Sequence, residues 1–131
     1  MQRRKIKESV HWLGAIDWDR RLFDSLVPLP DGTTYNAYVV RGSEKTALID
    51  TVEAEFDEEY VTNLIRAKVD AVAYIVANHA EQDHSGSLPL LLELFPMAKV
   101  IATEKGKELL CSMVLIDEER ILVVEDRDSI S

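Results

Sequence analysis

The chain has 131 residues, 47% hydrophobic and 30% charged, a composition typical of one globular domain with a real core. Its 24 acidic residues outnumber 15 basic ones, and the net charge of −9 argues against nucleic-acid or anionic-membrane partners. The basic residues 1–5 precede no apolar run, so we expect neither a signal peptide nor a membrane anchor. The single cysteine, Cys111, excludes an internal disulfide, fits the cytoplasm, and is expected inside as a small apolar residue.

The first half of the chain predicts strands and then a helix. Residues 9–14 are typical of a short strand, whereas residues 17–32 are rich in turn formers and predict irregular structure. Two more strands are expected at 35–40 and 46–50, joined by a hairpin turn. Residues 57–67 predict an amphipathic helix. Its apolar face would carry Tyr60, Val61, Leu64 and Ile65, and its solvent-exposed face would carry Glu58, Glu59, Asn63 and Arg66.

The second half alternates strands with helices. Residues 71–77 are nearly all apolar, as in a strand covered on both faces. Ser87 is a candidate cap for a helix over 88–95, and Thr103 for a helix over 104–113. Further strands are expected at 99–102 and 120–124, and residues 129–131 look like the start of another, which indicates a truncated or split chain. This order predicts the α/β or α+β class.

The segment His79-Ala80-Glu81-Gln82-Asp83-His84 holds two of the chain's three histidines and two carboxylates within six positions. Imidazole nitrogen and carboxylate oxygen are ligands for iron, manganese and zinc. In an extended segment His79, Glu81 and Asp83 would point the same way, and His84 would need a turn to join them. Four ligands crowd one ion, so the spacing favours two ions about 3.5–4 Å apart. The alternative is a polar surface loop whose histidines titrate freely.

Asp50 ends the strand at 46–50 and has two interpretations. Its carboxylate can orient a histidine ligand from behind, or it can cap the turn that follows. The residues alone do not separate these alternatives. His11, beside Val10 and Trp12, is better interpreted as a structural histidine of a strand.

At this point the sequence resembles a known family. Strand, hairpin, Leu48-Ile49-Asp50-Thr51, helix, apolar strand and histidine–acid loop follow each other as in the metallo-β-lactamase-like fold. Hydrolases of that fold carry His-x-His-x-Asp-His in the loop. Here Glu81 stands at the second histidine, and His79-x-Glu81-x-Asp83-His84 followed by Ser85-Gly86-Ser87 resembles the flavodiiron proteins. The resemblance implies the N-terminal half of a four-layer αββα sandwich, with residues 1–131 forming a partial domain.

The resemblance also implies a site and its cofactors. In that family the residues matching His79 and Glu81 bind one iron, and those matching Asp83 and His84 bind the other. The family's further ligands are two histidines and a bridging aspartate downstream, but this chain has no histidine after His84. FMN in a flavodoxin-like domain would feed electrons to the irons, and a donor such as rubredoxin would reduce the FMN. The complete protein would be a cytoplasmic homo-oligomer.

Three functions follow as alternatives. The first is an oxidoreductase that, when complete, reduces dioxygen to water or nitric oxide to nitrous oxide. The second is a metallo-β-lactamase-like zinc hydrolase, against which Glu81 argues, since an all-imidazole set suits zinc better. The third is a non-catalytic fragment. We expect the chain alone to be inactive, to bind iron or zinc weakly, and to leave an apolar sheet face open for the remaining half-domain or for self-association.

Overall fold

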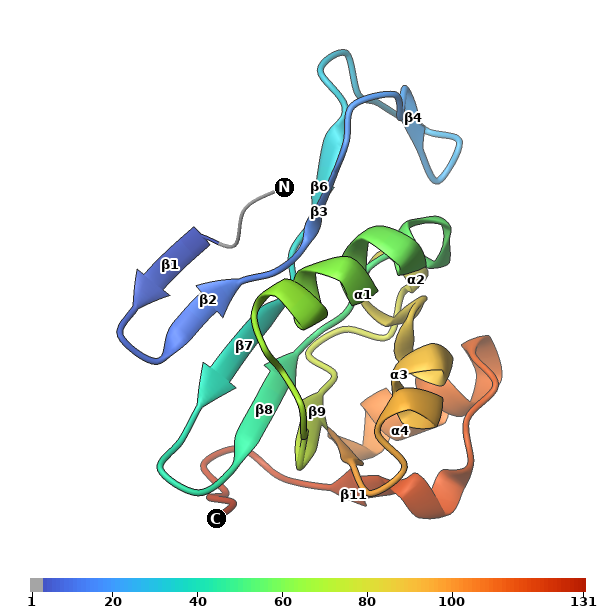
Figure 1. Cartoon of the computed structure of the whole chain (residues 1–131). Coiled ribbons are helices and arrows are strands. Elements are labelled where there is room, and N and C mark those ends of the chain that lie inside the picture. Colours follow the sequence, from blue (N-terminus) through green and yellow to red (C-terminus); the bar gives the residue numbers. More distant parts are fainter. Residues whose placement is uncertain (1–3) are drawn as a thin grey trace.

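The computed structural model describes residues 4–131, and its main element is a seven-stranded mixed sheet (Figure 1). The strand order is β1-β2-β7-β8-β9-β10-β11, in which the first four strands pair antiparallel and the last four pair parallel. These strands are β1 (Arg4–Lys7), β2 (Val10–Trp12), β7 (Tyr38–Arg41), β8 (Thr46–Ile49), β9 (Tyr74–Val76), β10 (Lys99–Ala102) and β11 (Ile121–Val123). The expected α+β class is confirmed. The expectation placed on residues 1–3 lies outside the described part of the chain.

Helices connect the parallel strands and cover one face of the sheet. They are η1 (Ala54–Phe56), α1 (Asp57–Arg66), α2 (Gln82–Ser85), α3 (Leu88–Leu94), α4 (Glu104–Met113) and η2 (Glu118–Arg120). The covered face carries one side chain from each of five strands, all buried: Val39, Leu48, Ile75, Val100 and Ile121. They share one core with Leu64 of α1, Leu91 of α3 and Leu110 of α4. This core fixes the strand ends that carry the candidate site.

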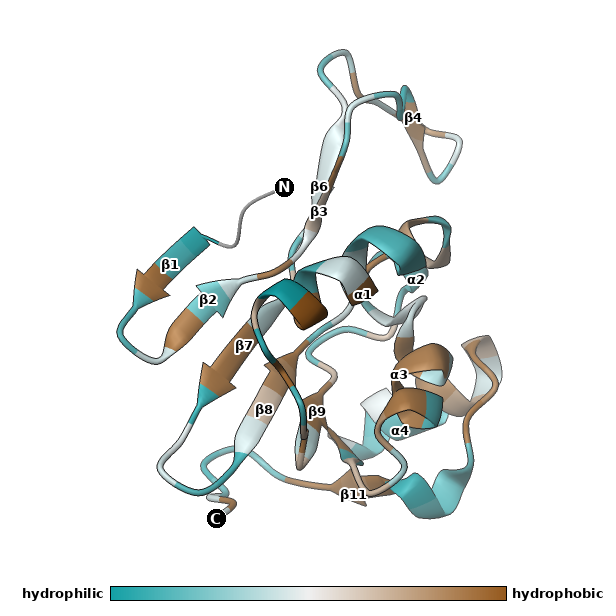
Figure 2. Cartoon of the chain, viewed as in Figure 1, coloured by the Kyte–Doolittle hydropathy of each residue, from teal (hydrophilic) through white to brown (hydrophobic). Residues whose placement is uncertain are grey.

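The opposite face of the sheet is also apolar, and among the described residues only the chain end, Ile130 and Ser131, lies against part of it. We call it the open face: Val40, Ala47, Ile49, Tyr74, Val76 and Leu122. These side chains are half-buried or, for Leu122, 45% exposed. Figure 2 shows apolar residues along β7, β8, β9 and β11. Strand β9 is therefore covered on one face only, and the expectation of two covered faces is not met by the described residues.

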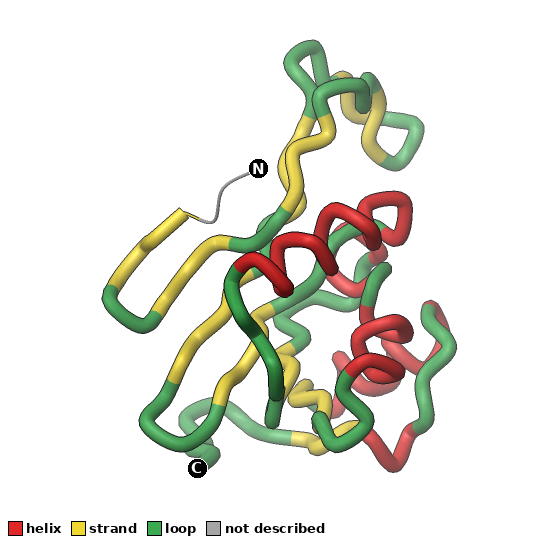
Figure 3. The backbone as a smooth tube through the Cα atoms, in the orientation of Figure 1, coloured by secondary structure: helices red, strands yellow, loops and turns green. Residues whose placement is uncertain are grey.

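Residues 15–35 form an arm that projects from the body (Figure 3). Its stem is the antiparallel pair β3 (Ala15–Asp17) and β6 (Thr33–Tyr35), and its tip is the short hairpin β4 (Leu22–Phe23) with β5 (Val27–Pro28). Buried Tyr35 ties the stem together, because its hydroxyl donates to Asp17 Oδ2 at 2.7 Å. The prediction of irregular structure holds for most of 17–32, and the two-residue strands β4 and β5 are the exceptions, since they are too short and too exposed to show a hydrophobic period.

Several local predictions are confirmed and others are corrected. Thr103 caps α4 through a hydrogen bond from Gly106 N to its side chain, as predicted. Ser87 precedes α3 but donates its hydroxyl to Val52 O instead of capping the helix. Residues 129–131 form no strand, and Cys111 is exposed rather than buried. The apolar side of α4 is narrow, with Leu110 its only buried residue, so Cys111 falls just outside it.

Helix α1 also differs in which residues it buries. Asn63 is 3% exposed, while Ile65 is 70% exposed, the reverse of the predicted faces. Asn63 is buried because its side-chain amide donates to the carbonyl oxygens of Leu13 and Gly14, at 3.2 and 3.1 Å. These two bonds join α1 to the start of the arm. A tertiary hydrogen-bond partner thus outweighs the hydrophobic pattern at this turn.

Candidate metal centre

The predicted metal-binding segment follows β9 at the carboxyl end of the parallel strands. His79 and Glu81 lie in irregular backbone, whereas Asp83 and His84 lie on the single helical turn α2. The expected extended run over 79–83 is therefore wrong in its second half. Ser85 closes the turn, because its backbone N–H donates to Glu81 O and its hydroxyl donates to Ala80 O at 2.7 Å. The helical turn sends Asp83 and His84 to the side of the loop where the strand ends meet.

The turn is held close to the loop that follows β8. Thr51 donates both its backbone N–H and its hydroxyl to His84 O, at 2.7 and 2.9 Å. A side chain at Gly86 would place its Cβ 2.6 Å from Ala54 N, so only glycine allows this approach. The backbone of His84 is thus fixed from the neighbouring strand end.

The four predicted ligands form two pairs. His79 Nε2 lies 3.6 Å from Glu81 Oε2, and His84 Nε2 lies 3.3 Å from Asp83 Oδ2. Two ligand atoms bound about 2.1 Å from one ion at angles of 90–109° would lie roughly 3.0–3.4 Å apart. The rings of the two histidines are 5.1 Å apart, edge to face, so the pairs are neighbours. Each pair is therefore spaced almost as two ligands of one ion would be.

Asp50 supports His84 from behind. Its Oδ2 lies 3.1 Å from His84 Nδ1, and its Oδ1 accepts a 2.7 Å hydrogen bond from Asn78 N. The carboxylate is 8% exposed, and its backbone takes the left-handed region at φ 54°. Of the two interpretations of Asp50, the contact with a histidine is confirmed. Since a carboxylate accepts, His84 Nδ1 is the donor in this contact, and in the neutral ring Nε2 then presents a lone pair.

This arrangement leaves two acceptors facing each other. The lone pair of His84 Nε2 points at Asp83 Oδ2, and Asp83 Oδ1 is buried without a hydrogen-bond partner. Two acceptors at 3.3 Å repel, and either a proton or a metal ion at Nε2 removes that repulsion. The Asp83–His84 pair is also the more enclosed one, at 20% and 31% side-chain exposure against 49% and 54% for Glu81 and His79. The donor set and the unpartnered oxygen both fit a bound metal ion.

The match to a metal site extends only to pairs of ligands. No three histidine, cysteine, aspartate or glutamate side chains within residues 4–131 are gathered closely enough to hold one ion together. Asp126 and Asp128 lie in the exposed segment after β11 and are not among the residues around the motif. The described part of the chain therefore presents two incomplete ligand sets side by side.

A cavity of about 280 Å³ opens beside the Asp83–His84 pair. It is lined by Arg20, Phe23 and Asp24 of the arm, Glu53 after β8, Glu81, Gln82 and Asp83 of the motif, and Met113 of α4. Arg20 and Glu53 were not singled out by the sequence analysis. Burial raises the pKa of the Glu53 carboxyl, and the nearby carboxylates of Glu55 and Asp83 raise it further, while Arg20 opposes them. No local pattern marks either residue, because Arg20 and Glu53 meet only when the arm folds back.

Comparison with known proteins places this fold and site. The family model of the metallo-beta-lactamase superfamily matches residues 30–128. A nitric oxide reductase of Moorella thermoacetica is 42% identical over 104 residues, 77% of this chain and 26% of that protein. A rubredoxin-oxygen oxidoreductase of Megalodesulfovibrio gigas is 38% identical over 133 residues, covering this chain fully and 33% of that protein. The crystal structure of the flavodiiron protein from Giardia intestinalis superposes with a TM-score of 0.90 at 30% identity, over 100% of this chain and 32% of that one.

The chain therefore belongs to the metallo-beta-lactamase superfamily. Within that superfamily, its similarity over most of its length is to flavodiiron proteins. It spans about a quarter to a third of the length of the relatives that it matches. Within residues 4–131, no helix has the length and hydropathy needed to cross a bilayer.

Proposed function

We propose that this chain supplies half of the ligands of a non-haem diiron site in an oxidoreductase that reduces dioxygen to water, nitric oxide to nitrous oxide, or both. His79 and Glu81 would hold one iron, and Asp83 and His84 the other. The observation that carries this proposal is the close pair His84 Nε2 and Asp83 Oδ2, at 3.3 Å, with Asp83 Oδ1 left unpartnered. The printed names of the relatives, a nitric oxide reductase and a rubredoxin-oxygen oxidoreductase, supply the two substrates.

The residues of this chain would position the metal ions and exclude water from the site, while the bound metal would carry the electrons. A pair of ferrous ions supplies the electrons and the open coordination positions for a diatomic gas. Asp50 would keep the hydrogen of His84 on Nδ1, so that Nε2 stays free to bind. Thr51 and Gly86 would keep the helical turn of Asp83 and His84 against the strand ends. Phe23 and Met113 would exclude bulk water from the cavity.

The electrons would come from FMN in a flavodoxin-like domain, which would itself be reduced by a donor such as rubredoxin. Support for these partners is the name of the rubredoxin-oxygen oxidoreductase and the longer chains of the relatives. The open face is apolar over strands β7, β8, β9 and β11, and we propose that the rest of the diiron domain covers it, residues 1–131 being part of that domain. Without that cover the chain would self-associate, which light scattering of the isolated chain measures. A clean monomer would contradict this.

The first test of the proposed function is whether the protein binds iron or zinc. We expect anaerobic Fe²⁺ to bind the isolated chain weakly, since each ion would leave most of its coordination sphere to water. Substitution of Asp83→Asn should remove the ion at the Asp83–His84 pair and leave the one at His79 and Glu81, while Asp70→Asn, at an exposed carboxylate, should leave both unchanged. Gas reduction by this chain with an artificial reductant, or zinc in place of iron in the protein as purified from cells, would contradict the proposal. Zinc preference would favour the hydrolase alternative.

A further inference from the structure

The tip of the arm has no core of its own. Strands β4 and β5 pair over two residues each, and Leu22, Leu26 and Val27 are all more than half exposed. A hairpin this short is not stable in water without packing against something else. The turn between its strands holds Asp24 and Ser25 in the left-handed region, at φ 48° and 59°, which adds strain. The tip therefore depends on a contact with the body.

Arg20 provides a contact between arm and body. Its Nη2 lies 3.6 Å from Glu53 Oε2 and its Nη1 lies 3.9 Å from Glu55 Oε2, both in the segment after β8. The Arg20 and Glu53 side chains are 29% and 15% exposed, so water screens this pair less than an ordinary surface pair. The backbone is set for this contact, because Asp17 Oδ1 accepts from Arg20 N at 3.0 Å.

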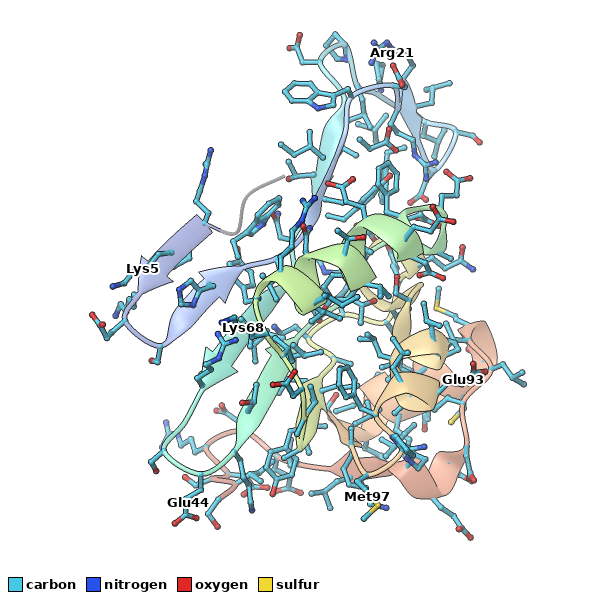
Figure 4. The ribbon with its side chains drawn as sticks, in the orientation of Figure 1. Lys5, Arg21, Glu44, Lys68, Glu93 and Met97 are labelled. Atoms are coloured by element: carbon cyan, nitrogen blue, oxygen red, sulfur yellow. The ribbon has the colours of Figure 1, made fainter. Side chains whose placement is uncertain are left out.

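The same contact places the wall of the cavity. Phe23 and Asp24 follow Arg20 at the tip and line the cavity on the arm side, while Glu81 and Asp83 line it on the motif side. Arg21 is a natural comparison, because its Nη1 donates only within the arm, to Trp18 O at 2.8 Å and Arg20 O at 3.2 Å. Figure 4 shows Arg21 at the far end of the arm, away from the helices.

We propose that Arg20 is a positioning residue, whose ion pair with Glu53 holds the arm tip over the candidate metal centre and closes the cavity beside Asp83. The arm then acts as a cover whose closure depends on one partly buried charge pair. Exchange of metal and entry of molecules larger than a diatomic gas are slowed, while the ligand atoms themselves are not touched by Arg20. The proposal deepens the proposed function, on which only its second test depends.

The first test is hydrogen exchange of the arm in the full 131-residue chain without metal. The amides of Leu26 and Leu29 donate to Phe23 O and Arg21 O at the tip and report its opening. Arg20→Gln and Glu53→Gln should each speed their exchange about fivefold, with Arg20→Lys close to wild type. Arg21→Gln is the matched control and should change nothing. Equal exchange in Arg20→Gln and Arg21→Gln would overturn the proposal, as would acceleration by Arg20→Gln without acceleration by Glu53→Gln.

The second test separates positioning from general stability. The chain is loaded with Co²⁺, and its affinity and its release rate to EDTA are measured. Arg20→Gln should leave the affinity within about twofold, since no ligand is altered, while loading and release both become about fivefold faster. A fall in affinity with an unchanged release rate would contradict the cover. If the wild-type chain binds no Co²⁺, the proposed function fails, and hydrogen exchange alone decides the role of Arg20.

Discussion

Substitution of Asp50→Asn tests most sharply whether Asp50 supports the candidate metal centre through its contact with His84. Asparagine matches aspartate in size and adopts the left-handed backbone at least as readily, so φ 54° is kept without new strain. Its amide oxygen can still accept from Asn78 N, at 2.7 Å in the wild type. The amide NH₂ group, however, would face His84 Nδ1 at 3.1 Å, so the hydrogen bond from the ring to a charged carboxylate is lost.

The magnitude follows from the one bond that is lost. A buried hydrogen bond to a charged group contributes about 1.5–3 kcal/mol. Because Asp50 is only 8% exposed, water cannot readily take over the lost hydrogen bond, and we expect the free energy of unfolding to fall by about that amount. If His84 is a ligand, the affinity for Fe²⁺ or Co²⁺ should also fall about 10–100-fold, because the ring is no longer held in its binding orientation.

Urea unfolding at neutral pH, followed by circular dichroism, measures the stability, and metal titration of the same samples measures the affinity. Asp70→Asn serves as the control, since Asp70 is exposed and surface substitutions stay within about 0.5 kcal/mol. If Asp50→Asn were as stable as Asp70→Asn, the contact with His84 would contribute nothing and the reasoning would fail. A loss of stability with unchanged metal affinity would remove His84 from the ligands.

Three further predictions concern glycine, tyrosine and the metal choice. Gly86→Ala should lower stability by about 1–3 kcal/mol in thermal unfolding, since its Cβ would lie 2.6 Å from Ala54 N; an unchanged melting temperature would count against the close approach. Burial raises the pKa of both Tyr35 and Tyr60 above 10.0, so the folded state holds their protons more tightly than the unfolded one. The stability that these two protonated tyrosines contribute is fully present below pH 10 and is lost as the pH rises further. In urea titrations at increasing pH, Tyr60→Phe should therefore lose less stability than the wild type. An identical pH dependence of stability in the variant would refute this. Glu81→His should shift bound metal from iron towards zinc in elemental analysis of protein loaded with both, and an unshifted ratio would show that Glu81 does not select the metal.

The sequence predicted the fold best where local signals agree with tertiary packing. Helix α4 begins and ends where predicted, because Thr103 supplies a cap and its neighbours favour helix. The arm was missed, since its short, exposed strands carry no alternation, and β1 was missed because all four of its residues are exposed. Asn63 and Ile65 exchanged faces because two distant carbonyl oxygens, invisible in a local window, bind Asn63.

The candidate site divides in the same way. The four candidate metal ligands lie within six positions, so their pattern alone pointed to them. The helical turn at Asp83 and His84 was not predicted, since it is stabilised by Thr51 from another strand end. Arg20 and Glu53 are 33 positions apart in the chain, and only the folded arm brings them together. Residues that support a site through long-range contacts have no spacing for a sequence to display.

The central claim is that the loop at 79–84 binds two separate ions, one at each histidine–carboxylate pair. Anomalous diffraction at the iron absorption edge, from crystals of this chain soaked anaerobically in Fe²⁺, tests it directly. The account predicts two peaks, one within about 2.5 Å of His79 Nε2 and Glu81 Oε2 and the other equally close to Asp83 and His84 Nε2. A single peak shared by all four side chains, or iron bound only elsewhere on the chain, would contradict it.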